Sequence, residues 1–160
     1  MRWPVLLFSV VTAGCAGLLG GEVPRKVHGR VYVGPFVSEE AYAAFLEGTL
    51  AERRGDLAQA EEAYLRSASQ DRRHPDPWVR IAALRCTQGD RPGSDGAFAR
   101  AARLDPEFGP LLREQARCAE ARGESAQARE FALRAVAADP SDSEPPLLLA
   151  QLALASGDAA

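Results

Sequence analysis

The sequence predicts an all-α fold, a solenoid of antiparallel helix pairs with three repeats followed by one extra helix. Two observations lead to this prediction. A glycine returns every 34 residues, at Gly55, Gly89, Gly123 and Gly157, and an acidic residue follows each one. A small residue precedes each glycine by seven positions: Gly48, Ala82, Ala116 and Ala150. A fixed period of this length is typical of helical units that bury their apolar faces by stacking on one another.

Composition narrows the possible functions. The chain has 160 residues, a formal net charge of −3 and 46% hydrophobic residues, which is ordinary for a folded helical protein. No concentrated basic patch is present, so we expect no nucleic-acid partner. The histidines and cysteines show no ligand spacing, and no catalytic or phosphate-binding motif occurs, so we expect no metal, cofactor, small-molecule substrate or enzymatic activity.

The N-terminal segment has the features of an export signal. One arginine is followed by an apolar run from Val5 to Val11, and then by Thr12-Ala13-Gly14-Cys15. A short positive start, an apolar core and small residues before a break are typical of a secretory signal. The stretch resembles a bacterial lipoprotein signal peptide, which would occupy residues 1–14. The resemblance implies that Cys15 becomes the lipidated first residue of the mature protein.

Three other interpretations of this segment stay open. It could be an uncleaved membrane anchor, although Trp3 to Leu19 barely reaches the length of a span. It could be an ordinary secretory signal, or a fortuitous apolar start on a cytosolic scaffold. If the lipoprotein interpretation holds, Ala16 after the cysteine favours the outer membrane, so we expect a bacterial envelope protein, lipid-anchored and facing the periplasm. Acyl chains contribute about 0.8 kcal/mol per buried methylene, so such an anchor is stable.

Residues 15–37 are rich in glycine and proline, which rules out a helix of useful length. Val31-Tyr32-Val33 could form a short extended piece, but we favour a flexible tether. Ser38 then has the character of an N-cap, because Glu39 and Glu40 follow in the first turn, where the helix dipole favours anions. The folded repeat domain is therefore expected to occupy residues 38–160.

The repeats are predicted at residues 41–74, 75–108 and 109–142, with a partial unit at 143–160. In the first repeat, helices are expected over 39–53 and 57–70, separated by Gly55-Asp56. Two antiparallel helices cross closely only where side chains are small, and Gly48 and Ala60 supply such a crossing beside Tyr64. The second helix of the second repeat begins Arg91-Pro92-Gly93, and its proline is tolerated only in the first turn.

These positions carry a resemblance to the tetratricopeptide repeat (TPR) family over residues 41–157. The family has a small residue at position 8, alanine at 20, an aromatic residue at 24 and proline at 32. The chain departs from this pattern at Arg72, Ser94 and Ala132. The positions expected to be structural are Gly48, Gly55, Ala60, Tyr64, Trp78, Ala82, Gly89, Phe98, Ala116, Gly123, Ala128 and Gly157.

The partial fourth unit has one expected helix, over 144–156, that is apolar on nearly every side. A capping helix should be polar on its outer face. We therefore expect either that the array continues or that a partner covers this end.

The resemblance also implies a groove lined by the first helix of each repeat, through positions 2, 5, 9 and 12. Arg113 and Arg117 could hold an acidic partner segment, although a solvated pair near Glu114 and Glu120 is the favoured interpretation. The Lys and Asn set with which the family's best-known groove clamps a peptide carboxylate is missing. The groove residues implied are Tyr42, Phe45, Thr49, Glu52, Asp76, Val79, Ala83, Cys86, Pro110, Arg113, Arg117 and Glu120.

Cys86 and Cys118 lie on the first helices of adjacent repeats. An oxidising compartment would permit a disulfide, but we expect buried free thiols, which are commoner in helical cores.

Together these features predict a lipid-anchored adaptor that binds segments of partner proteins, with a place in the assembly of an envelope machine suggested by analogy to relatives of this layout. The alternative is a docking or regulatory segment of a larger, possibly enzymatic, protein.

Overall fold

The computed structural model describes residues 22–27, 30–35 and 37–156. The signal segment with Cys15, and Gly157, lie outside these ranges. The chain divides into two compact units, residues 1–36 and residues 37–160, and each is described by itself.

In the first unit, two strands lie within the stretch 15–37 for which composition predicts a tether. β1 (Glu22–Val27) pairs antiparallel with β2 (Arg30–Pro35). Their register places Glu22 opposite Pro35 and Val27 opposite Arg30. The valines and the tyrosine of this stretch favour extended backbone, and the short extended piece that the sequence left open at Val31–Val33 lies within β2.

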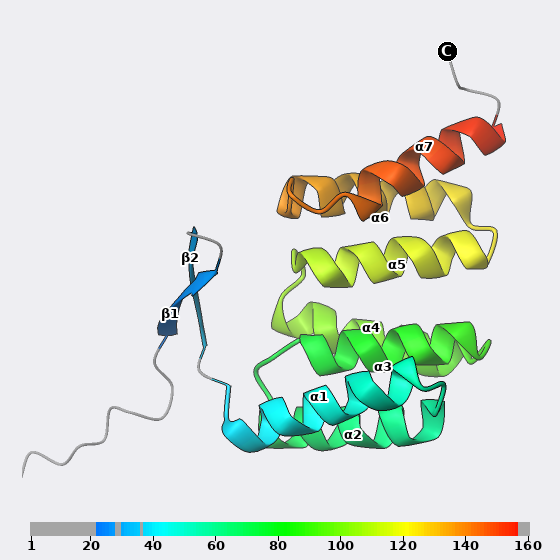
Figure 1. The fold of residues 1–160 in the computed structure, drawn as a ribbon. Coiled ribbons are helices and arrows are strands. Elements are labelled where there is room, and N and C mark those ends of the chain that lie inside the picture. The colour runs from blue at the N-terminus through cyan, green and yellow to red at the C-terminus, as the bar shows by residue number, and fades with distance from the viewer. Residues whose placement is uncertain (1–21, 28–29, 36, 157–160) are drawn as a thin grey trace, which may run out of the picture. The chain divides into compact units, whose positions relative to one another are not determined.

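The second unit is an all-α solenoid, as predicted. Successive helices form antiparallel pairs, α1 with α2, α3 with α4 and α5 with α6, and α7 packs on the last pair (Figure 1). The first helices of the pairs form one layer, here called the inner face, and the second helices form the outer face. The helices are α1 (Glu39–Arg53), α2 (Leu57–Gln70), α3 (Asp76–Thr87), α4 (Arg91–Leu104), α5 (Gly109–Ala121), α6 (Ser125–Ala138) and α7 (Glu144–Ser156).

The helix boundaries follow from caps and from one glycine per repeat. The Ser38 hydroxyl accepts a hydrogen bond from the Ala41 amide at 3.1 Å, which confirms the predicted N-cap of α1. Asp56 caps α2 and Asp90 caps α4 in the same way. The glycine before each second helix has a positive φ, 80° at Gly55, 77° at Gly89 and 75° at Gly123, a conformation that favours glycine.

Small residues allow the two helices of a pair to cross closely. Gly48 of α1 meets the Tyr64 ring of α2, and a Cβ at Gly48 would lie 2.7 Å from Tyr64 Cδ1. Ala82 and Ala116 occupy the matching positions of α3 and α5 and are buried. Ala60, Phe98 and Ala128, at further positions of the repeat register, are also buried, and Trp78 is half-buried.

α7 differs from the earlier first helices in having no second helix of its own among the described residues. Ala150 is exposed, whereas its counterparts Gly48, Ala82 and Ala116 are buried. Leu147 and Leu154 are also exposed. This gives α7 the apolar open face that its sequence predicts. No helix in the described part of the chain combines the length and apolarity needed to cross a bilayer.

Candidate functional site

A pocket of about 500 Å³ opens on the inner face between α1, α3 and α5. We call it the inner pocket. Its wall mixes apolar side chains with charged ones from three successive repeats. The lining residues are Glu52, Leu57, Arg80, Ala83, Leu84, Cys86, Thr87, Glu114, Arg117, Cys118, Glu120 and Ala121.

A row of alternating charges crosses the inner pocket from one repeat to the next. The Tyr64 hydroxyl donates to Glu52 Oε2 at 2.8 Å. Glu52 accepts from Arg80, whose other terminal nitrogen lies 3.5 Å from Glu114 Oε1. Glu114 is buried, so its negative charge depends on nearby guanidinium groups for compensation. The row ties three repeats together through charge-assisted hydrogen bonds.

Burial and neighbouring charges act in opposite directions on the pKa of Arg80. Burial alone would lower the pKa of its guanidinium, but the charges of Glu52 and Glu114 and the hydrogen bond with Tyr64 outweigh burial and raise it. Burial also raises the pKa of the Tyr64 hydroxyl; the hydrogen bond with Thr49 opposes this rise, and Glu52 adds to it. Arg80 is therefore held charged, and Tyr64 is held neutral.

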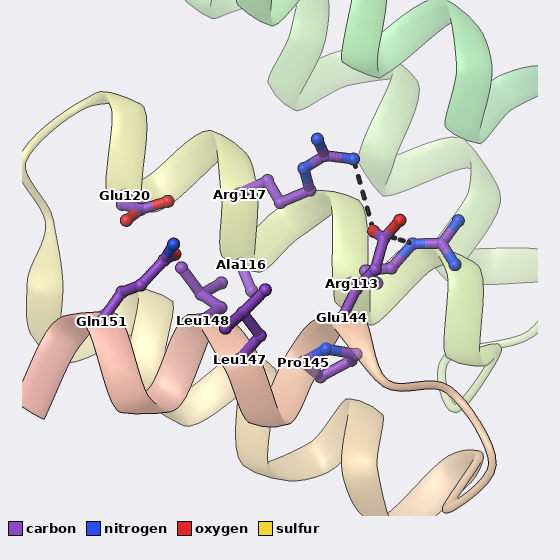
Figure 2. Close-up of a pocket in the computed structure, with 9 residues that line it drawn as sticks. All are labelled: Arg113, Ala116, Arg117, Glu120, Glu144, Pro145, Leu147, Leu148 and Gln151. Carbon is purple, nitrogen blue, oxygen red and sulfur yellow. Dashed lines mark hydrogen bonds and ion pairs between the residues drawn. The ribbon is translucent and has the colours of Figure 1, made fainter.

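A second pocket, of about 320 Å³, lies between α5 and α7, and we call it the C-terminal pocket. In Figure 2, Arg113 and Arg117 of α5 reach toward Glu144 at one end, while Glu120 and Gln151 lie at the other. Arg113 Nη1 lies 2.8 Å from Asp142 Oδ2, and Arg117 Nη1 lies 3.5 Å from Glu144 Oε2. These arginines are thus compensated within the chain.

The compensation also holds Arg113 in its charged state. Burial tends to lower the pKa of Arg113, but the hydrogen bond with Asp142 and the charges of Glu114, Asp142 and Glu144 raise it. Arg113 and Arg117 both lie near Glu114, at 3.6 and 3.8 Å, as in the pair favoured from sequence, and Arg117 is exposed. Asp142, just before α7, and Glu144, its first residue, supply further carboxylates to these arginines.

A disulfide lies in the wall of the inner pocket. Cys86 of α3 and Cys118 of α5 are bonded, with their Cα atoms 6.0 Å apart, which is an ordinary separation for a bridge. The expectation of free thiols is therefore wrong. The two cysteines are 32 residues apart, close to one repeat. Adjacent first helices therefore bring them together.

The structure separates the groove residues implied by the resemblance into two groups. Those that line the inner or C-terminal pocket are Glu52, Ala83, Cys86, Arg113, Arg117 and Glu120. Those that do not are Tyr42, Phe45, Thr49, Asp76, Val79 and Pro110. Val79 is a correction, because only 2% of it is exposed and it belongs to the core.

Three of the remaining residues have local roles. Phe45 packs on the Tyr64 ring with centroids 5.3 Å apart. Thr49 donates to the Phe45 carbonyl at 3.0 Å. An Asp76 carboxylate oxygen lies 3.7 Å from His74 Nδ1.

Sequence reasoning missed the residues that complete the charged row. Arg80 and Glu114 occupy the same repeat position, 34 residues apart, and carry opposite charges. Opposite charges one period apart on neighbouring first helices are a signal that could have found this pair. Asp142 precedes α7 and Glu144 is its first residue. Their counterparts one period earlier, Phe108 and Pro110, are uncharged, so the two carboxylates give no such periodic signal.

Comparison with solved structures shows the fold. The TPR2B domain of yeast Sti1, solved as a complex with pHsp70, superposes with a TM-score of 0.64 at 22% identity, over 74% of this chain and 99% of that one. The Yersinia enterocolitica type III secretion chaperone SycD, solved with a peptide of the translocator YopD, gives 0.61 at 15% identity, over 74% and 96%. Pseudomonas aeruginosa PilF gives 0.67 at 18% identity, over 74% of this chain and 55% of PilF.

These likenesses show that residues 37–156 have the TPR fold. No protein-family model matches the chain. No curated protein matches it either. Within the described residues, no group of three or more His, Cys, Asp or Glu side chains could hold a metal ion.

Proposed function

We propose that this chain is a TPR adaptor that binds a segment of a partner protein along its inner face. The observation that carries the proposal is the inner pocket, about 500 Å³ in volume, with walls from three repeats. Pockets that mix apolar walls with a few placed polar groups are typical binding sites. Two of the similar structures were solved with peptide or protein ligands, which supports a binding role for this fold.

The charges of the inner pocket indicate what kind of segment fits. Glu52 and Glu114 neutralise Arg80, and Glu114 and Glu144 lie near Arg117. Glu120 is exposed, and no ion pair engages it within the described residues. The pocket therefore offers a free carboxylate beside apolar walls, which suits a segment with a basic side chain next to an apolar one.

The proposal extends to the cellular localisation of the protein. The export-signal pattern with Cys15 suggests a lipid-anchored protein of the bacterial envelope, facing the periplasm. The disulfide between Cys86 and Cys118 supports this proposal, because such bonds persist in oxidising compartments and are rare in the cytosol. A role in assembling an envelope machine is part of the same proposal and rests on analogy.

Photo-crosslinking tests the inner face as the binding site. A photoreactive amino acid at Thr87, which is exposed and lines the inner pocket, should give an adduct with a specific envelope protein. The same group at Gln127, exposed on α6, should not give that adduct. Ala83→Arg, which fills the inner pocket, should abolish the Thr87 adduct. An adduct that survives Ala83→Arg, or that forms equally from both sites, would contradict the proposal.

The intact mass of the mature protein from a membrane fraction tests the proposed localisation. A lipid-modified Cys15 at the N-terminus is the expected result. A chain that keeps Met1 and remains in the soluble fraction would remove the anchor from the proposal without affecting the inner-face experiment.

A further inference from the structure

A third pocket lies on the outer face, and the proposed function does not use it. It has a volume of about 490 Å³ and lies between the last turns of α2 and α4, beside the start of α3. We call it the outer pocket. Its lining residues are Leu65, Ala68, Ser69, Arg72, Trp78, Arg100, Arg103 and Leu104.

The outer pocket gathers three positive charges and no negative one. Arg72, Arg100 and Arg103 are exposed, and no Asp or Glu lines the pocket. Across the described residues, none of the three forms an ion pair, in contrast to the arginines of the inner face. Each helix C-terminus carries only about half a negative charge. The ends of α2 and α4 therefore do not neutralise three guanidinium groups.

The other repeats supply an internal comparison for Arg100. Arg66 and Arg134 occupy the same repeat position, one period before and after it. Arg66 pairs with Glu47 at 2.7 Å, and Arg134 pairs with Glu107 at 2.8 Å. Arg100 instead lies over the Trp78 ring, with its Cζ 4.5 Å from the ring centroid. Stacking holds the guanidinium plane while leaving its edge N–H groups free to bind an anion.

Arg72 is a departure from the repeat at the same place. The position carries Pro106 and Pro140 in the next two repeats, and the repeat pattern predicts proline there. The structure places the Arg72 side chain in the wall of the outer pocket. The arginine that stands in place of the repeat's proline thus adds a third cation to a pocket that already holds Arg100 and Arg103.

The walls of the pocket are apolar between these charges. Leu65 and Leu104 are each 39% exposed, and Trp78 is half-buried beside them. A bare inorganic anion would satisfy the arginines but leave this apolar surface in water. The matching ligand is therefore anionic and apolar at once.

We propose that the outer pocket binds an acidic segment of a partner protein, with carboxylates paired to Arg72, Arg100 and Arg103 and an apolar side chain between Leu65 and Leu104. Guanidinium groups pair with carboxylates through two parallel hydrogen bonds, which gives such a segment a defined orientation. A membrane surface is the weaker match, because the cations surround a hollow rather than a flat apolar patch. The site lies apart from the inner pocket, so one chain can bind two segments.

Trp78 provides the readout. The chain has two tryptophans, and Trp3→Phe leaves Trp78 as the only one. The full chain carrying this change is titrated with a short peptide, capped at both ends, in which Glu alternates with Leu. We expect a saturable change in Trp78 emission that weakens as salt is added. The same peptide with Gln in place of Glu should give no saturable change.

Matched variants assign the site. Arg100→Gln and Arg72→Pro should each weaken binding by about tenfold, as expected for the loss of a charge-assisted hydrogen bond. Arg134→Gln, at the same repeat position but in an ion pair, should change the affinity by less than about twofold. Far-ultraviolet circular dichroism checks that every variant remains helical.

Several results would overturn the proposal. These are no saturable change with the acidic peptide, or equal losses of affinity in Arg100→Gln and Arg134→Gln. Binding to vesicles of phosphatidylglycerol but not to the peptide would assign the surface to membranes instead. A response to inorganic phosphate equal to that with the peptide would show that the apolar walls take no part.

Discussion

The inner face and the outer pocket both gather arginines, but only the inner face supplies carboxylates to match them. Arg80 lies between Glu52 and Glu114, and Arg113 is held by Asp142. Arg100 lies on the face of Trp78 instead. The same residue type therefore joins repeats to one another on the inner face and remains available for a ligand on the outer face. What decides the role of an arginine in this array is whether a carboxylate of the chain lies within reach of its guanidinium group.

The largest expected effect comes from the disulfide, which belongs to the inner pocket and has no counterpart in the outer one. The double substitution Cys86→Ser and Cys118→Ser should lower the free energy of unfolding by about 3 kcal/mol, because the bridge closes a loop of one repeat. Urea unfolding measures this. The acidic peptide should still bind the outer pocket with nearly unchanged affinity, and a parallel loss there would show that the two pockets are not independent.

Removing one arginine from each face tests the comparison directly. Losing one partner of a buried ion pair costs about 3–5 kcal/mol. Arg80 is partly exposed, and Arg113 lies 3.6 Å from Glu114, so Arg80→Met should cost about 2 kcal/mol. Arg100→Met loses only an exposed contact with Trp78 and should cost about 0.5 kcal/mol. Equal losses of unfolding free energy in the two variants, measured by urea unfolding, would remove the distinction between the two faces.

Arg72→Pro should have a smaller effect on the free energy of unfolding, and should raise it. Asp71 before it is extended, with φ −128° and ψ 100°. Asp105 and Asp139, which precede prolines in the next repeats, have similar backbones. The substitution should therefore fit without strain and raise the free energy of unfolding by about 0.5 kcal/mol, by restricting the unfolded chain. Destabilisation would mean that the arginine is needed for folding and is not spare for a ligand.

Tyr64 gives the smallest effect, at alkaline pH. Its pKa is raised in the folded protein, chiefly by burial, so the neutral hydroxyl is the form that folding favours. The raised pKa contributes to the free energy of unfolding. This contribution is complete below the ordinary tyrosine pKa of about 10 and is lost as pH rises through the raised value. Between neutral pH and about pH 11, the midpoint temperature of thermal unfolding should fall less steeply with pH for Tyr64→Phe than for the native chain. Identical slopes would show that the pKa of Tyr64 is not raised in the folded protein.

The repeat period predicted the solenoid because each local signal agrees with it. Glycine at Gly55, Gly89 and Gly123 ends one helix and permits the turn before the next, and small residues mark where the helices cross. The strands β1 and β2 were not predicted, because glycine and proline on either side suggested a tether and the pairing of two short segments leaves no periodic pattern.

The sites were less predictable than the fold. The groove positions taken from the resemblance place side chains on first helices, but they do not say which of these are buried, as Val79 is. Arg80 and Glu114 become partners only through stacking across one period. The outer pocket depends on Arg72, Trp78 and Arg100, which come from three helices or turns and converge only in the folded array. Arg72 stood out in the sequence as a departure from proline, but without a role.

The most direct test of the two-face account is a map of where an acidic peptide perturbs the protein. In nuclear magnetic resonance spectra of the isotopically labelled chain, the Glu-Leu peptide should shift the indole N–H of Trp78 and the side-chain Nε–H signals of Arg72, Arg100 and Arg103. The signals of Arg80 and Arg113 should stay in place, because internal carboxylates already occupy them. Shifts centred on Arg80 and Arg113, with Trp78 unchanged, would contradict the account.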